Sequence, residues 1–232
     1  MRSGSERSVL GVEIAVSDAV RFRRRILAWW HAHRRHFPWR ETTDPYRVLL
    51  AEVLLQKTDA PKVVPVYLDA VSKFPTLLVL AHADPRRLRR TLAPLGLHYR
   101  AERLRRMARG FVARFGAVPA DFMALRSVPG VGRYIASAVC SQAFGQRRAV
   151  LDTNVVRVLE RCFGIRSDRA RARDDPRMWD VAQRLLPRRA SDAARWNWAL
   201  LDFAAVCCRA RSPDHEACPV HAQCFVRNTA AQ

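Results

Sequence analysis

The sequence is poor in lysine and in acidic residues. Lys57, Lys62 and Lys73 are its lysines, and 41 basic residues stand against 21 acidic ones, so the formal net charge is +20. A coding bias in the source genome would explain arginine in place of lysine, but not the positive balance itself. A balance this large predicts a polyanionic partner, for which nucleic acid is the leading candidate and an anionic membrane surface the rival.

Long hydrophobic runs are missing as well. No stretch of 18 or more apolar residues is present to span a membrane, and the first 18 residues lack a basic-then-apolar leader. Apolar residues still make up 49% of the 232 positions, which is enough for a packed core in one large or two small domains. We therefore expect a soluble, intracellular protein without membrane contact, cytoplasmic and associated with the nucleoid.

Strand signals are missing, whereas helix signals recur. Period-2 alternation is absent, and Asp44-Pro45 and Asp84-Pro85 each place an N-cap before a proline in the first helical turn. Further helices are expected over 18–35, 100–115, 120–127, 133–144 and 178–186, and from Asp152 to about Cys162. The stretch 166–177 is expected to be a loop. The predicted fold class is all-α.

Cysteine is clustered rather than spread along the chain. Four of the six cysteines fall between positions 207 and 224, while Cys140 and Cys162 stand alone. This distribution is not that of a disulfide framework, and in a reducing compartment it indicates metal binding.

Glycine is scarce, yet "VPGVGR" places Gly130 and Gly132 two positions apart. Such glycines permit a positive φ and a close backbone approach. A helix that follows them would present the N–H groups of Val131, Gly132 and Arg133 outward, where they could bind a phosphate. An ordinary turn between two helices is the alternative, but the net charge and the basic helix before this turn favour the phosphate site.

Three separated motifs resemble the endonuclease III superfamily of helix-hairpin-helix DNA glycosylases, over about Phe37 to Cys224. "LRSVPGVGRYIASAV…AVLDTNVVRVLERCFG" is similar to the family's hairpin and its Gly/Pro-rich loop with an aspartate. "PWRETTDPYRVLLAEVLLQKT" resembles the first barrel helix of the mismatch (thymine/adenine) branch, and "DFAAVCCRARSPDHEACPVHAQC" resembles the iron–sulfur loop. The resemblance implies a six-helix barrel with the hairpin at 43–156, a second helical domain from 1–42 and 157–232, and DNA in the cleft between them.

The resemblance also assigns the chemistry. Asp152 matches the catalytic aspartate, which stabilises the positive charge that builds on the sugar, although an aspartate before a helix is often only its N-cap. Tyr134 stands where bifunctional members carry a lysine that forms a Schiff base. Because a phenol cannot form an imine, a monofunctional enzyme is expected. Glu52 matches the glutamate that faces the base pocket, with a surface or salt-bridged glutamate as the alternative.

The expected partner is double-stranded DNA that contains a mismatched or damaged base, bound by a monomer. Gln56 and Lys57 occupy the turn that in relatives fills the gap left by the flipped base, and His98 and Tyr99 match a second such turn. Thymine or uracil opposite guanine is the favoured substrate. Adenine opposite guanine or 8-oxoguanine is the alternative within the enzyme class, and a non-catalytic DNA-binding protein is the alternative outside it.

The cysteine pattern departs from that of the family. The family spacing C-x6-C-x2-C-x5-C falls here on Cys208, His215, Cys218 and Cys224, so a histidine replaces one cysteine. Imidazole can ligate iron in clusters, and a [4Fe–4S] cluster with one histidine ligand is expected. The alternatives are that Cys207 is recruited instead, that the site binds zinc, or that the cluster is lost.

Overall fold

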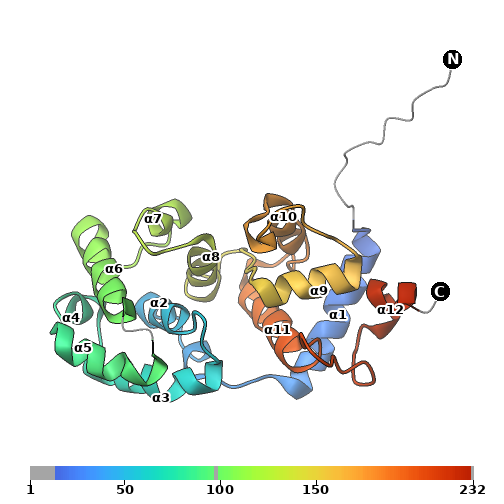
Figure 1. Cartoon of the computed structure of the whole chain (residues 1–232). Helices are drawn as coiled ribbons and strands as arrows, with labels where there is room; N and C mark the ends of the chain where they lie inside the picture. Colours follow the sequence, from blue (N-terminus) through green and yellow to red (C-terminus); the bar gives the residue numbers. More distant parts are fainter. Residues whose placement is uncertain (1–13, 97–98, 231–232) are drawn as a thin grey trace. The chain divides into compact units, whose positions relative to one another are not determined.

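The protein is described by a computed structural model that covers residues 14–96 and 99–230 (Figure 1), and within these residues every regular element is a helix. The predicted all-α class is confirmed. The α-helices are α1 (Val16–His33), α2 (Pro45–Leu54), α3 (Ala60–Lys73), α4 (Leu77–Ala81), α5 (Pro85–Leu92), α6 (Tyr99–Phe115), α7 (Phe122–Arg126), α8 (Arg133–Gln142), α9 (Thr153–Phe163), α10 (Pro176–Arg184), α11 (Ala193–Val206) and α12 (Phe225–Ala230). Short 3-10 turns lie at Pro38–Arg40, Ala93–Leu95, Ala172–Asp174, Ala190–Asp192 and His221–Gln223. None of the helices in the described ranges is long and apolar enough to cross a membrane.

The chain divides into two compact units. One unit consists of the described residues up to Ala32 together with Leu151–Leu185 and the described residues from Leu200 onward. The other consists of His33–Val150 and Leu186–Ala199, and it contains α2 to α8. The domain limits expected from the resemblance, 43–156 for the barrel, remain a prediction.

Both aspartate–proline pairs begin helices as predicted. Asp44 Oδ1 accepts a hydrogen bond from the Tyr46 amide at 2.9 Å at the start of α2. Asp84 Oδ1 accepts one from the Arg87 amide at 2.7 Å at the start of α5. The N-terminal amides of a helix have no partner within it, so these caps fix where each helix begins.

Helix α2 lies inside the core of its unit. Its side chains from Val48 to Leu54 are all buried, and this stretch includes the single charged residue Glu52. Helix α8 packs against α2, and it is also buried along most of its length. Any polar group between these two helices must therefore find its partner within the protein.

Helix α6 is basic as predicted, but several of its arginines bind the protein itself. They donate to backbone carbonyl oxygens: Arg103 to Gly130 (2.8 Å), Arg109 to Ala81 (2.9 Å) and Arg114 to Ser127 (2.7 Å). Two of these carbonyls belong to the segment between α7 and α8. Helix α6 therefore holds the glycine-containing turn between α7 and α8 through two hydrogen bonds to its backbone carbonyls.

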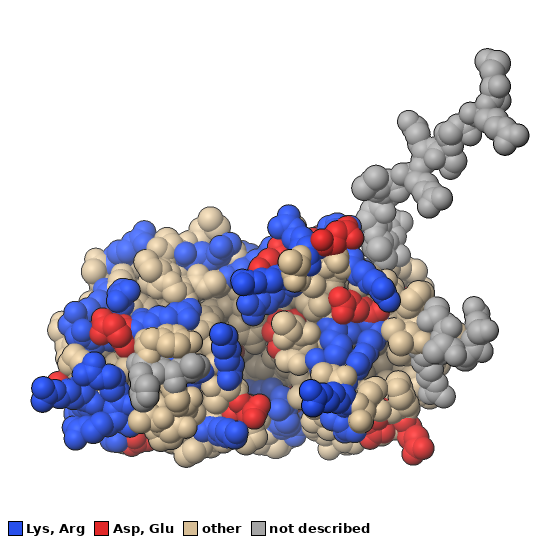
Figure 2. Space-filling view, in the orientation of Figure 1, with Lys and Arg blue, Asp and Glu red and all other residues tan. Residues whose placement is uncertain are grey.

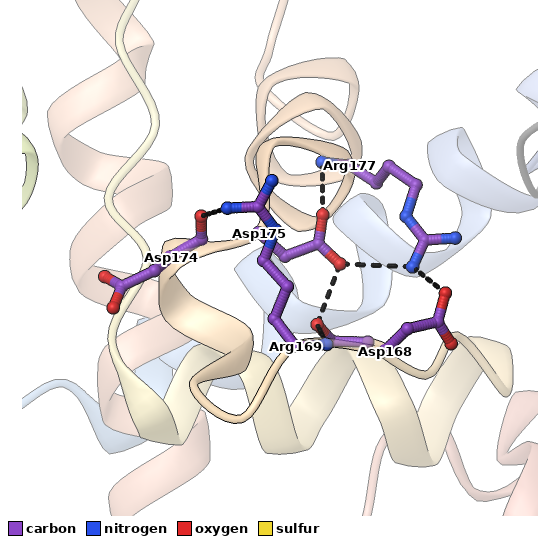
Figure 3. Close-up of polar contacts among 6 residues, drawn as sticks. Asp168, Arg169, Asp174, Asp175 and Arg177 are labelled. Carbon is purple, nitrogen blue, oxygen red and sulfur yellow. Dashed lines mark hydrogen bonds and ion pairs between the residues drawn. The ribbon is translucent and has the colours of Figure 1, made fainter.

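The segment 166–177 is more ordered than a plain loop, and α10 begins at Pro176 rather than at the predicted 178. Asp175 is buried and caps α10, since its Oδ1 accepts from the Arg177 amide at 2.9 Å. Its Oδ2 accepts from Ser167 Oγ at 2.7 Å and from the Arg177 guanidinium at 3.2 Å (Figure 3). Burial alone would raise the pKa of Asp175, but these hydrogen bonds outweigh it and the pKa is lowered.

Replacing Asp175 by alanine should lower the free energy of unfolding by about 1–2 kcal/mol at neutral pH, because α10 loses its cap. A lowered pKa in the folded state means that the carboxylate stabilises the fold above its unfolded pKa, and that this contribution is lost as the pH falls. The difference between wild type and variant should therefore shrink below about pH 4. Urea unfolding across pH measures it. Asp174→Ala is the control: Asp174 accepts a hydrogen bond from Arg169 with its backbone carbonyl, which the substitution leaves in place. A pH-independent difference would contradict the assignment.

Candidate functional site

The turn between α7 and α8 has the geometry that its glycines predict. Gly130 has a φ of +98°, a conformation that favours glycine, and a Cβ there would lie 3.2 Å from Arg103 Nε. Helix α8 begins after Gly132 without a side-chain cap. One detail of the prediction is wrong: the Val131 amide donates to the Val128 carbonyl at 3.1 Å, so it closes the turn instead of facing outward.

Three arginines gather at this turn. Burial lowers the pKa of Arg133 first, and the nearby charges of Arg126 and Arg148 lower it further. Neighbouring guanidinium groups repel each other because they carry the same charge, and an anion bound between them offsets that repulsion. Basic side chains also outnumber acidic ones on the face shown in Figure 2. The turn therefore presents a strongly positive surface.

The turn at residues 54–58, here called the wedge turn, follows α2 and carries Gln56 and Lys57. Lys57 is exposed and has a φ of +57°, which is strained for a residue other than glycine. Arg100 on α6 holds the turn in this shape: it donates to the Leu54 carbonyl at 2.9 Å, to the Gln56 carbonyl, and to Thr58 Oγ1 at 2.8 Å. This contact was not predicted from the sequence, because its two sides lie more than 40 residues apart.

The predicted tyrosines lie in different surroundings. Tyr99 is 54% exposed at the start of α6, whereas Tyr134 on α8 is half-buried against the core of its unit. His98, which was predicted to form the second gap-filling turn together with Tyr99, lies outside the described residues. The phenol of Tyr134 offers no amine for a Schiff base, so the expectation of a monofunctional enzyme keeps its chemical basis.

Glu52 is buried in α2, so the alternative of a surface glutamate is wrong. It is only 4% exposed, and its Oε1 accepts a hydrogen bond from Gln142 Nε2 at 3.0 Å. Gln142 is the last residue of α8 and is itself buried. A functional role for Gln142 was not predicted, because 90 residues separate it from Glu52.

Asp152 caps α9 and is held by three hydrogen bonds. Its Oδ1 accepts from the amides of Asn154 at 2.9 Å and Val155 at 2.8 Å, and its Oδ2 accepts from Asn154 Nδ2 at 2.7 Å. The side-chain Oδ1 of Asn154 in turn accepts from Arg157 Nη1 at 3.0 Å. Arg157 also donates to two backbone carbonyls, those of Ala204 and Cys208. The carboxylate is thus fixed in direction, and Asn154 and Arg157 are two functional candidates that the sequence analysis missed.

The segment 207–224, here called the cysteine loop, folds against the end of α9. Cys207 donates to the Asp214 carbonyl at 3.4 Å and is hydrogen-bonded to Cys218. Arg161 on α9 donates to Cys208 Sγ at 3.7 Å, and its carbonyl accepts from Cys224 Sγ at 3.4 Å. His215, the predicted ligand, is exposed.

Several thiols of this region influence one another. The pKa of Cys162 is raised by burial and then by the nearby Cys208, Cys224 and Cys218. The pKa of Cys207 is raised by its hydrogen bond with Cys218 and then by burial. Across the described residues, no three His, Cys, Asp or Glu side chains are placed to hold a single metal ion. A cluster differs from a single ion because each thiolate binds a separate iron, so its ligands stand further apart.

Comparisons with known proteins find DNA glycosylases among the relatives of this chain. The chain is 38% identical to the thymine-DNA glycosylase of Aeropyrum pernix over 89% of this chain and 94% of the relative. It is 39% identical to the thymine/uracil-DNA glycosylase of Pyrobaculum aerophilum over 88% of this chain and 90% of the relative. It is also 34% identical to the adenine DNA glycosylase of Homo sapiens over 94% of this chain, which corresponds to 41% of that protein.

The fold and the motifs together define the class. A solved structure of a thermostable thymine-DNA glycosylase matches 93% of this chain and 100% of its own, with a TM-score of 0.85 and 32% identity. Residues 50–179 match the family described as HhH-GPD superfamily base excision DNA repair protein. The chain belongs to the HhH-GPD superfamily of base excision DNA repair proteins, and the predicted enzyme class, a DNA N-glycosylase, is confirmed.

The wedge turn should depend on Arg100. Arg100→Met keeps the apolar length but removes the donors, so that the buried Leu54 carbonyl loses its partner at a cost of about 1–3 kcal/mol. Hydrogen exchange of residues 54–58 should speed up, and urea unfolding should show the loss. Arg106→Met on the same helix is the control, because among the described residues the polar contact of Arg106 is an exposed one of 3.9 Å with Glu102. Equal stability of the two variants would show that Arg100 does not hold the turn.

Proposed function

We propose that this protein is a monofunctional DNA glycosylase that removes thymine or uracil opposite guanine from double-stranded DNA. The observation that carries the proposal is the Asp152 carboxylate, fixed by three donors at the start of α9, in a chain with Tyr134 at the lysine position. The names of the archaeal relatives support the choice of base. A single chain carries the proposed catalytic and DNA-binding residues, so we infer that it acts as a monomer. We also infer that it acts in the cell compartment that contains the chromosomal DNA.

Each part has a step in this mechanism. The glycine turn before α8 and its arginines bind the phosphate backbone, and the wedge turn fills the space of the flipped base. As the bond between the base and C1′ lengthens, positive charge builds on the sugar, and the Asp152 carboxylate stabilises it. Water then attacks C1′ and loses a proton. The free base takes up a proton and departs, which leaves an abasic site in an intact strand.

Adenine is the second candidate base. The similarity to the human adenine DNA glycosylase supports it, although the chain spans less than half of that protein. The buried Glu52 fits both readings, because a carboxylate can accept from an N–H of thymine or uracil and can exchange a proton with adenine. Only the choice of duplex distinguishes them.

The test is excision on labelled duplexes that contain T:G, U:G, A:G or A:8-oxoguanine. We expect alkali-sensitive sites first on T:G and U:G, strands that stay intact until alkali is added, and no adduct after borohydride. Asp152→Asn should keep DNA binding and lose about 10²–10³-fold in rate, a loss typical of removing transition-state electrostatics. Asp84→Asn is the control, since Asp84 caps α5 in the same way. A trapped adduct, or full activity of Asp152→Asn, would overturn the mechanism.

We further propose that the cysteine loop holds a [4Fe–4S] cluster. The donor set supports it, since Cys208, Cys218 and Cys224 lie close enough to Cys162 of α9 to raise its pKa, beyond the larger effect of burial. Cys208, Cys218 and Cys224 would each hold one iron. His215 is the fourth ligand that the spacing predicts. The burial of Cys207 and its bond to Cys218 favour Cys207 as the alternative. When bound, the cluster would serve as a structural cross-link of the loop.

Iron and sulfide analysis of the purified protein tests this proposal. Cys218→Ala should lose the iron and the yellow-brown colour. If His215 is the fourth ligand, His215→Ala should lose iron while Cys207→Ala keeps it, and the reverse result would identify Cys207. Zinc without iron in the wild-type protein would refute the cluster.

A further inference from the structure

The buried contact between Glu52 and Gln142 has a place in the proposed reaction. Both side chains lie between α2 and α8, at 4% and 7% exposure, and the amide donates to the carboxylate at 3.0 Å. Apolar residues dominate the same stretch of both helices. A polar pair in such surroundings resists turning, because a buried hydrogen bond that breaks is not replaced by one to bulk water.

We propose that Gln142 is a positioning residue, whose amide fixes the Glu52 carboxylate in the direction from which it contacts the flipped base. This inference rests on the proposed function, in which Glu52 faces the base pocket. With Oε1 held by Gln142, rotation of the carboxylate would break this hydrogen bond, so the contact favours one orientation of the group. A misplacement of about 1 Å at such a group can slow a reaction roughly 100-fold.

The chemistry of the amide suits this role better than that of a cation or a hydrocarbon. A guanidinium at this position would neutralise the carboxylate and compete with the base for it. A leucine would leave the buried carboxylate without its partner. A neutral amide orients the carboxylate and leaves its charge in place, and after a turn of its own plane it can also accept from the protonated form.

Packing alone does not require the pair. Replacing both members of a buried polar pair by apolar groups of similar shape is often neutral for stability, or even stabilising. The stability of the fold therefore gives no reason for a glutamate at 52 together with a glutamine at 142. Positioning for catalysis gives one.

The test is single-turnover excision and DNA affinity of Gln142→Met, a change that preserves size, on the duplex from which the wild type excises a base fastest. We expect the rate to fall roughly 10- to 100-fold while the dissociation constant for DNA stays within about twofold, a split that simple misfolding would not produce. Gln146→Met is the matched control, because Gln146 is only partly buried and its amide donates to the Ala120 carbonyl, away from Glu52. Gln142→Leu replaces Gln142→Met if the latter does not fold.

A double-mutant cycle completes the test. If Gln142 acts through Glu52, then Glu52→Gln combined with Gln142→Met should be no slower than Glu52→Gln alone. The inference would be overturned if the rate losses of the two single variants multiplied in the double variant, or if either Gln142→Met or Glu52→Gln excised at the wild-type rate. Each of these results would leave the glycosylase proposal standing. A wild-type protein that excises no base from any of the four duplexes would instead overturn the proposed function.

Discussion

Guanidinium groups that donate to backbone carbonyls hold the turns and helix ends of this protein. The last carbonyls of a helix have no partner within it, and a guanidinium offers five N–H donors on a long stem. Such contacts secure the wedge turn, the glycine turn, the cysteine loop and the segment after Leu185, through Arg100, Arg103, Arg114, Arg147, Arg157 and Arg161. With 41 basic and 21 acidic residues, carboxylates are too few to take this part.

The same contacts leave the charge of the protein intact. A carbonyl oxygen carries no net charge, so an arginine bound to it adds one full positive charge to the field of the protein, whereas an arginine–carboxylate pair has a net charge of zero. The ion pairs of the described residues are mostly exposed contacts between neighbouring turns of one helix, such as Lys73 with Asp69 at 2.7 Å. Pairs of that kind contribute about 0.3–0.5 kcal/mol each. The fold is therefore braced by arginine without losing the field that attracts a polyanion.

Local signals in the sequence were sufficient for many of the helices but not for α3 or α11, which were not predicted, and separated motifs were sufficient for the family. The Asp-Pro pairs fixed the starts of α2 and α5 because capping acts within three residues. Partners across the fold could not be predicted in the same way. Gln142 meets Glu52 only because α8 packs on α2, and Arg100 reaches the wedge turn only because α6 passes beside it. Such contacts depend on helix packing, which a periodic pattern does not specify.

In the proposed mechanism Asp152 both caps α9 and stabilises charge on the sugar, and its surroundings explain how one residue could do both. In the described part of the chain its hydrogen-bond donors are neutral: two backbone amides and the Asn154 side chain. A cation bound to the carboxylate would neutralise the negative charge that, in the proposed mechanism, stabilises the positive charge developing on the sugar. Arg157 lies one turn further along α9, but its guanidinium is taken by the Asn154 oxygen and by the carbonyls of Ala204 and Cys208. The hydrogen bonds from Arg157 to backbone carbonyls thus also keep its guanidinium from pairing with the Asp152 carboxylate. Asp152 can therefore cap α9 and still offer its negative charge to the sugar in the proposed reaction.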